Sequence, residues 1–324
     1  MALLMAANWL SELADELEQK IINSLAGVVG HALNASQELL AMGMNNNAAA
    51  PSSTSNASNG LFANFLTHHP SEFDATLTGS HGGEMWNDME NLCNSAVVPI
   101  AGLIMVVILL NDLLQMIMEG NNFRDFDISI LFKWIFKAVC GIILISNVYY
   151  ITSGFLSFGT SATNSAINAI FHLNGTYMTG STITIDPTGL GIPELLLDLI
   201  LAGFLLLIVG ALLVVMIIVL ASRMIEIFMY LTAAPLPVAT MMNRDWGEIG
   251  KNWIRNMVAL GFQGFFIVVA LSIFQTIFSA VVSTLNTSTD TLTWQLLLLM
   301  GYALALCFTI LKSGSISKSV FNAH

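Results

Sequence analysis

The scarcity and clustering of cationic residues constrain this chain more than any other feature. Only ten lysines and arginines occur in 324 residues, and nine of them lie in three clusters beside long apolar runs. Three long stretches, 21–123, 138–222 and 256–311, contain no cation. Because lysine and arginine are retained on the cytoplasmic side of a bilayer, each gap predicts an excursion to the far side. The chain is therefore expected to cross a membrane repeatedly.

The composition is typical of a polytopic membrane protein. Hydrophobic residues make up 55% of the chain and charged residues only 10%, whereas soluble domains carry roughly 25% charged residues. The net charge is -11, and the few cations form no basic surface of the kind that binds nucleic acid. The three cysteines, Cys93, Cys140 and Cys307, have no metal-ligand spacing.

Five apolar segments are long enough to span a bilayer, which requires about 20 residues per helix. We therefore predict an all-α fold, a polytopic membrane helical bundle of about five transmembrane helices. The expected spans cover about 95–118, 131–155, 193–222, 257–285 and 292–311. An uncharged segment from about 159 to 192 is expected outside the membrane. Five crossings place the N-terminus outside and the C-terminus in the cytoplasm.

The region before the first span divides into two parts. Residues 1–42 have leucine and isoleucine at steps of three or four, which predicts an amphipathic helix that packs on protein or lies on a membrane surface. Residues 43–92 are expected to form a flexible linker and a small extracytoplasmic cap. The cap contains His68, His69 and His81. Their spacing matches no known metal site, which leaves either solvated histidines or a metal site without a recognised pattern.

A proline-containing apolar segment at about 224–242 has two interpretations. Arg223 precedes it and Arg244 follows it, so the charge pattern places both ends on the cytoplasmic side. Pro235 and Pro237 each remove a backbone N–H and disfavour helix just upstream. The segment is expected to form a re-entrant hairpin that is buried in protein or lines a cavity. The alternative is a kinked helix at the cytoplasmic face.

Polar residues near the cytoplasmic ends of the spans are the candidate functional residues, because polar groups in a bilayer face other helices or water. Three follow helical steps along the first span, and the others lie where the third span ends and the fourth begins. The set comprises Asp112, Gln115, Glu119, Arg223, Glu226 and Arg255. They predict either a hydrated, pore-lining vestibule or a structural belt of ion pairs and interfacial charges.

Familiar catalytic motifs are missing from the sequence. It contains no G-x-x-x-x-G-K-[ST] loop, no H-E-x-x-H and no G-x-S-x-G. We therefore expect no enzyme activity and no catalytic, cofactor-binding or metal site. A secondary transporter would be favoured by internal repeats and mid-membrane charges, and neither is visible. A passive channel or scaffold subunit, energised by other proteins, is the leading hypothesis.

The stretch RMIEIFMYLTAAPLPVATMMNRDWGEIGKNWIRNMVALGFQG, residues 223–264, resembles the TrbL-like family of conjugative transfer proteins. In that family a span ends in an arginine and an acid, a proline-containing apolar segment follows, and a Gly-Lys-Asn-aromatic stretch leads into another span. The matching residues here are Arg223, Glu226, Pro235, Pro237, Gly250, Lys251, Asn252 and Trp253. The resemblance covers about 130 residues from Pro193 onward.

The resemblance implies a multi-pass subunit of a type IV secretion machine in the bacterial inner membrane. Such a subunit would act as a homo-oligomer and assist passage of DNA or protein. The implied partners are other type IV secretion subunits, including a pilin or stalk subunit and cytoplasmic ATPases, together with membrane lipid and translocating single-stranded DNA. The residues themselves leave a second hypothesis open, a stand-alone solute transporter or channel.

Overall fold

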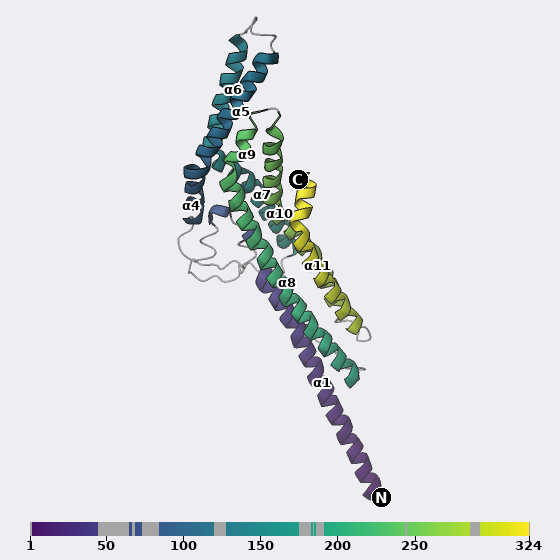
Figure 1. The fold of residues 1–324 in the computed structure, drawn as a ribbon. Coiled ribbons are helices and arrows are strands. Elements are labelled where there is room, and N and C mark those ends of the chain that lie inside the picture. Colours follow the sequence, from purple (N-terminus) through teal and green to yellow (C-terminus); the bar gives the residue numbers. More distant parts are fainter. Residues whose placement is uncertain are drawn as a thin grey trace. The chain divides into compact units, whose positions relative to one another are not determined.

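The computed structural model describes residues 2–44, 65–66, 69–72, 84–119, 128–174, 183, 185, 191–243, 245–285 and 292–323. Every long element in these ranges is a helix (Figure 1). The α-helices are α1 (Ala2–Met44), α4 (Glu84–Leu92), α5 (Val98–Glu119), α6 (Ile128–Ser146), α7 (Val148–Asn174), α8 (Ile192–Ala233), α9 (Pro235–Thr240), α10 (Gly247–Leu285) and α11 (Leu292–Val320). A 3-10 turn, Pro70–Glu72, and a π-helical turn, Cys93–Val97, complete the order.

The predicted all-α polytopic bundle is confirmed. Four helical stretches are long and apolar enough to cross a membrane: Glu84–Met118, Ile192–Ala233, Gly247–Thr284 and Leu292–Val320. A fifth crossing is possible through the pair Leu131–Ser146 and Val148–Ala169, which is bent by 67°. Within the described residues there are therefore four candidate spans, or five if the bent pair is one span.

The second predicted span differs from the observed helices in shape and length. It was expected to end near 155, with an outer segment beginning near 159, but α7 continues to Asn174. The bend lies at Asn147, whose Nδ2 donates to the Ile143 carbonyl at 2.9 Å. In the Ser/Thr-rich part of α7 the hydroxyls bond carbonyls of the preceding turn, as Thr163 does to Gly159 at 2.8 Å, so these polar side chains are satisfied within the helix.

The region around 224–242 consists of a helix end, a short helix and a turn. Helix α8 passes through Arg223 and ends at Ala233, beyond the expected end near 222. Pro235 then begins the six-residue α9, where its missing N–H and fixed φ are tolerated at the first helical position. Turn residues 241–243 and 245–246 lie between α9 and α10. Whether this segment enters the bilayer stays a prediction.

The entry to the first span contains a π-helical turn, Cys93–Val97, just before Pro99. The backbone N–H of Val98 donates to the Cys93 carbonyl, five residues earlier. Proline lacks the N–H that would bond the carbonyl of Ser95, and its ring crowds that carbonyl in a regular helix. The wider turn relieves this conflict and lets α4 and α5 form one long helical stretch.

The described chain forms two compact units. Unit 1 comprises Met1–Ala63, Asn168–Ile218 and Val269–Leu311, and unit 2 comprises Asn64–Ile167, Val219–Val268 and Lys312–His324. Unit 1 has nine carboxylates and a single lysine or arginine, Lys20, whereas unit 2 has twelve carboxylates and nine lysines or arginines. The cations are therefore concentrated in unit 2.

Unit 1 contains the second half of α1 packed against the start of α8. Ile22 and Ala26 of α1 form a buried cluster with Leu195. Asn34 accepts the backbone N–H of Ile183 at 3.0 Å and donates to its carbonyl at 3.4 Å. An acid is also buried here: Asp198 of α8 accepts a 2.6 Å hydrogen bond from Thr293 Oγ1 of α11.

The core of unit 2 is formed where α9 packs against α5 and α6. Its buried residues are Ala101, Met105, Ile108, Leu109, Ile145, Val148, Ala234, Val238, Ala239 and Met242. Trp134 of α6 packs against this cluster and donates its indole N–H to the Leu109 carbonyl at 2.9 Å. The proline-containing segment is thus embedded in the core of its unit and not appended to it. Of the expected linker and cap, 43–64 lies almost entirely outside the described residues.

Candidate functional site: a buried arginine at a helix crossing

Arg223, near the C-terminal end of α8, is buried within unit 2 and only 3% exposed. Its Nε donates to the Leu260 carbonyl at 3.2 Å, and its Nη2 donates to the Gly261 carbonyl at 3.1 Å. Both acceptors belong to α10, where each carbonyl already serves a helical N–H. A carbonyl oxygen has two lone pairs, so the guanidinium adds bonds without breaking the helix. The positive charge therefore joins two helices.

Glycines on α10 and α7 make room for this contact. A Cβ on Gly264 would lie 2.9 Å from Arg223 Nη1, so any side chain there would displace the guanidinium. A Cβ on Gly159 of α7 would lie 2.4 Å from the backbone carbon and oxygen of Gly261. Helices α7 and α10 consequently approach with their backbones almost touching, as small residues permit in membrane proteins.

Helix α11 completes the arrangement from a third side of α10. Ser317 Oγ donates a short hydrogen bond to the Ala259 carbonyl, and Gln263 Nε2 donates to Ser313 Oγ at 3.2 Å. Three consecutive carbonyls, 259–261, thus receive side-chain donors from two neighbouring helices. We call this set the α10 junction, formed by Gly159, Arg223, Ala259, Leu260, Gly261, Gln263, Gly264, Ser313 and Ser317.

The polar stripe of α5 lies elsewhere in unit 2 and bonds other partners. Asp112, whose side chain is 8% exposed, forms an ion pair with Lys137 Nζ of α6 at 2.6 Å. Gln115 Nε2 donates to Asp245 Oδ2 in the turn before α10 at 3.1 Å. The side chain of Glu119 lies outside the described residues. The structure therefore pairs Asp112 with Lys137, whereas Arg223 bonds backbone carbonyls.

Two of the remaining predicted polar residues, Glu226 and Arg255, are not part of the junction. Glu226 is partly buried on α8, and Arg255 is exposed on α10. Of the hairpin prolines, Pro235 is buried and Pro237 partly buried. A Cβ on Gly250 would lie 2.6 Å from the Pro237 carbonyl, so α9 packs directly on the first turn of α10.

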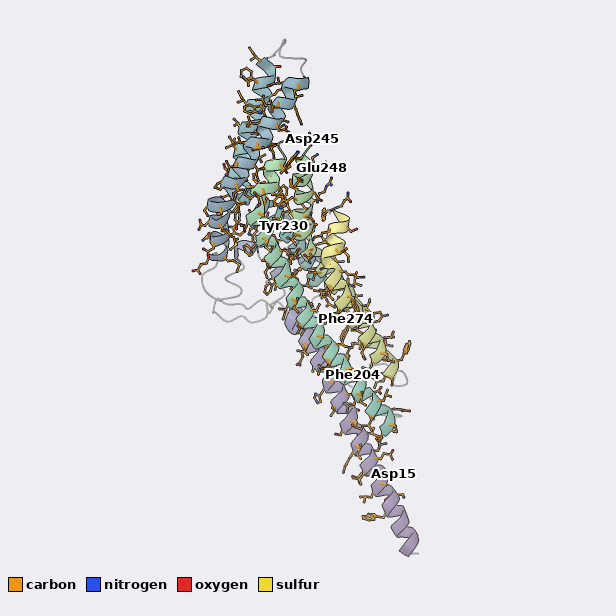
Figure 2. The ribbon with its side chains drawn as sticks, viewed as in Figure 1. Asp15, Phe204, Tyr230, Asp245, Glu248 and Phe274 are labelled. Atoms are coloured by element: carbon orange, nitrogen blue, oxygen red, sulfur yellow. The ribbon has the colours of Figure 1, made fainter. Side chains whose placement is uncertain are left out.

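The other family-matching residues have structural contacts at that turn. Lys251 pairs with Glu248 at 3.1 Å on an exposed surface. Figure 2 labels Glu248, in the first turn of α10, near Asp245 of the preceding turn. Asn252 is partly buried, and Trp253 packs against the α5–α6–α9 core. The Gly-Lys-Asn-aromatic stretch thus places a small residue under α9 and an aromatic residue against the core.

The histidines of the cap gather no metal-ligand cluster within the described ranges. His69 Nδ1 lies 2.9 Å from Ser71 Oγ, and its ring lies 5.6 Å from that of Trp86. His68 and His81 lie outside the described residues. His69 therefore contacts a serine hydroxyl and an aromatic ring.

Sequence reasoning missed Lys137, Asp198 and the two serines of the α10 junction. Asp198 had a usable signal, because an acid inside an apolar run is costly and deserves notice for that reason alone. Lys137 and the two serines had no such signal, because no local pattern in the sequence shows which helices become neighbours. Gly261, Gly264 and Gln263 of α10 contribute the close approach and the side-chain hydrogen bond of the junction.

A family comparison bears directly on these helices. The model of the TrbL/VirB6 plasmid conjugal transfer like protein family matches residues 60–235, which is more than half of the 324-residue chain. The chain belongs to this family. The match includes α4 to α8 and ends at Pro235, so it contains Arg223 but not the Gly250–Trp253 stretch. Neither the curated proteins nor the solved structures gave a match to the chain.

Family membership assigns the chain to the conjugal transfer and type IV secretion systems as a structural subunit. Together with its apolar helices, it makes the chain a multi-pass protein of the inner membrane that works with other subunits of the transfer system. The α10 junction gives this fold a rigid crossing of four helices within unit 2. Its donors and acceptors bond one another, which suits a structural role better than proton transfer or substrate turnover.

Proposed function

We propose that this protein is a channel or platform subunit of a bacterial conjugation machine that assists passage of DNA or protein across the inner membrane. It acts as a homo-oligomer together with a pilin or stalk subunit and cytoplasmic ATPases, and translocating single-stranded DNA passes along it. Its N-terminus lies outside the cytoplasm and its C-terminus inside. The observation that carries this proposal is the match to the TrbL/VirB6 family over residues 60–235.

The distribution of charge supports the proposed orientation. Nine of the ten cations belong to unit 2, and the three chain segments of unit 1 contain only Lys20. Under the positive-inside rule, the cation clusters at 124–137, 223–255 and 312–318 face the cytoplasm. The cation-free stretches 21–123, 138–222 and 256–311 then contain the excursions to the opposite side.

The exposed surface supports assembly into an oligomer. Helix α6 exposes Phe132, Phe136 and Ile143, and α8 exposes Leu207 and Ile218, each by more than half of its side-chain surface. Lipid or further protein must cover these side chains. A polar substrate would not cross along such apolar faces, so its path is shared among several copies or bounded by other subunits.

Deletion and complementation test the proposal. Loss of the gene should abolish DNA transfer between mating cells and the assembly of the machine, and a plasmid-borne copy should restore both. Unchanged transfer and assembly in the deletion strain would contradict it. A stand-alone transporter instead predicts solute flux into liposomes that contain only the purified protein. Single-residue loss of a turnover reaction would point to a membrane enzyme.

A further inference from the structure

A groove on unit 2 has a graded polarity that matches a membrane lipid. It has a volume of about 560 Å³. Its apolar part is formed by one face of α5, Leu103, Ile104, Val107 and Ile108, and its polar end by Asn111, Asn243 and Trp246. From Leu103 to Asn111 the helix rises about 12 Å. The hydrocarbon chain of a lipid can lie along this face of α5, with the polar part of the lipid at the polar end of the groove, which we call the amide end.

The polar end contains a buried donor that needs an acceptor. Asn243 is 2% exposed, and its Oδ1 accepts the backbone N–H of Asp245 at 2.7 Å. Its Nδ2 has no hydrogen-bond partner among the described residues. A buried amide donor is costly to leave unsatisfied. An oxygen of a bound phosphate or ester group would satisfy it.

The carboxylate of Asp245, near the polar end of the groove, favours one class of headgroup. Asp245 is exposed in the same turn, and its carboxylate is held toward α5 by Gln115. A carboxylate repels an anionic headgroup and attracts an ammonium group. Trp246, 54% exposed, is the kind of amphipathic side chain that lies at headgroup level.

We propose that this groove binds one phospholipid with an ethanolamine headgroup. Its acyl chain lies along Leu103 and Val107, its phosphate accepts a hydrogen bond from Asn243, and its ammonium group pairs with Asp245. The occupant is a lipid because the groove opens on a helix face that the bilayer bathes, and because its polarity changes in one direction. The site requires only a chain embedded in a membrane, so it stands apart from the role in substrate passage.

Native mass spectrometry of the purified full chain tests the proposal. The protein is incubated with equal amounts of a phosphatidylethanolamine and a phosphatidylglycerol of matched acyl chains, and the bound lipid is identified. Val107→Trp fills the groove, whereas Val106→Trp adds the same bulk at a neighbouring exposed position that does not line it. Both side chains are exposed, by 67% and 52%, so neither substitution disturbs the core.

The expected result is one retained phosphatidylethanolamine on the unsubstituted chain and on Val106→Trp, and its loss on Val107→Trp. Asn243→Leu, which removes the donor, should weaken retention about tenfold. Equal retention by the two tryptophan variants would overturn the assignment of the groove. Preferential retention of phosphatidylglycerol would overturn the assignment of the headgroup to Asp245.

Discussion

The α10 junction makes a sharp prediction about Gly264. Replacing it with alanine adds a Cβ that would lie 2.9 Å from Arg223 Nη1, and overpacking of this kind costs about 1–3 kcal/mol. Alanine also favours helix over glycine by about 0.8–1 kcal/mol. Gly264→Ala should therefore reduce the free energy of unfolding by up to about 2 kcal/mol when Arg223 is present.

Removing the guanidinium should reverse the sign of that effect. In an Arg223→Met background the side chain ends before the position of Nη1, so Gly264→Ala should become neutral or stabilising by up to about 1 kcal/mol. Gly250→Ala is the matched control, because its Cβ would lie 2.6 Å from the Pro237 carbonyl and is not close to Arg223. Its cost should be the same in both backgrounds.

The assay is a double-mutant cycle on the free energy of unfolding, measured on purified protein in one detergent. The expected coupling between positions 223 and 264 is about 1–3 kcal/mol, and that between 223 and 250 is close to zero. Equal effects of Gly264→Ala in the two backgrounds would refute the placement of the guanidinium against α10.

Two further predictions concern unit 2. Asp112 and Lys137 should show a coupling energy of about 0.5–3 kcal/mol in a cycle of Asp112→Asn and Lys137→Met, and additive single effects would show that the 2.6 Å ion pair does not form. Gly250→Ala should lower the free energy of unfolding by about 1–3 kcal/mol, because its Cβ would lie 2.1 Å from Met241 Cγ. Gly247→Ala is its control, since the nearest atom to its Cβ is 3.8 Å away; equal losses at both glycines would argue against the packing of α9 on α10.

The sequence predicted most of the helices because bilayer physics leaves few options for apolar runs of about 20 residues. It also indicated the family from the residues around Arg223 and Pro235. Helix ends were less predictable. Arg223 marks a cytoplasmic boundary in the charge pattern, yet α8 continues for ten residues beyond it, because its guanidinium is satisfied by carbonyls of α10 and needs no water.

The partners of the polar residues could not be predicted, because they depend on which helices pack together. Asp112 and Lys137 are 25 residues apart and lie on the two helices of a hairpin, and several other cations were equally plausible on sequence grounds. The bend at Asn147 has a local cause, but the sequence alone did not predict it. A single asparagine in an apolar run either continues a helix or breaks it, according to what its side chain bonds.

The orientation of the chain in the membrane is the central claim, and compartment reporters on the two termini test it most directly. Alkaline phosphatase, active only outside the cytoplasm, and a fluorescent protein that matures inside it are fused in turn to each end. We predict phosphatase activity from the N-terminal fusion and fluorescence from the C-terminal fusion. Signals from both termini in the same compartment would contradict the account.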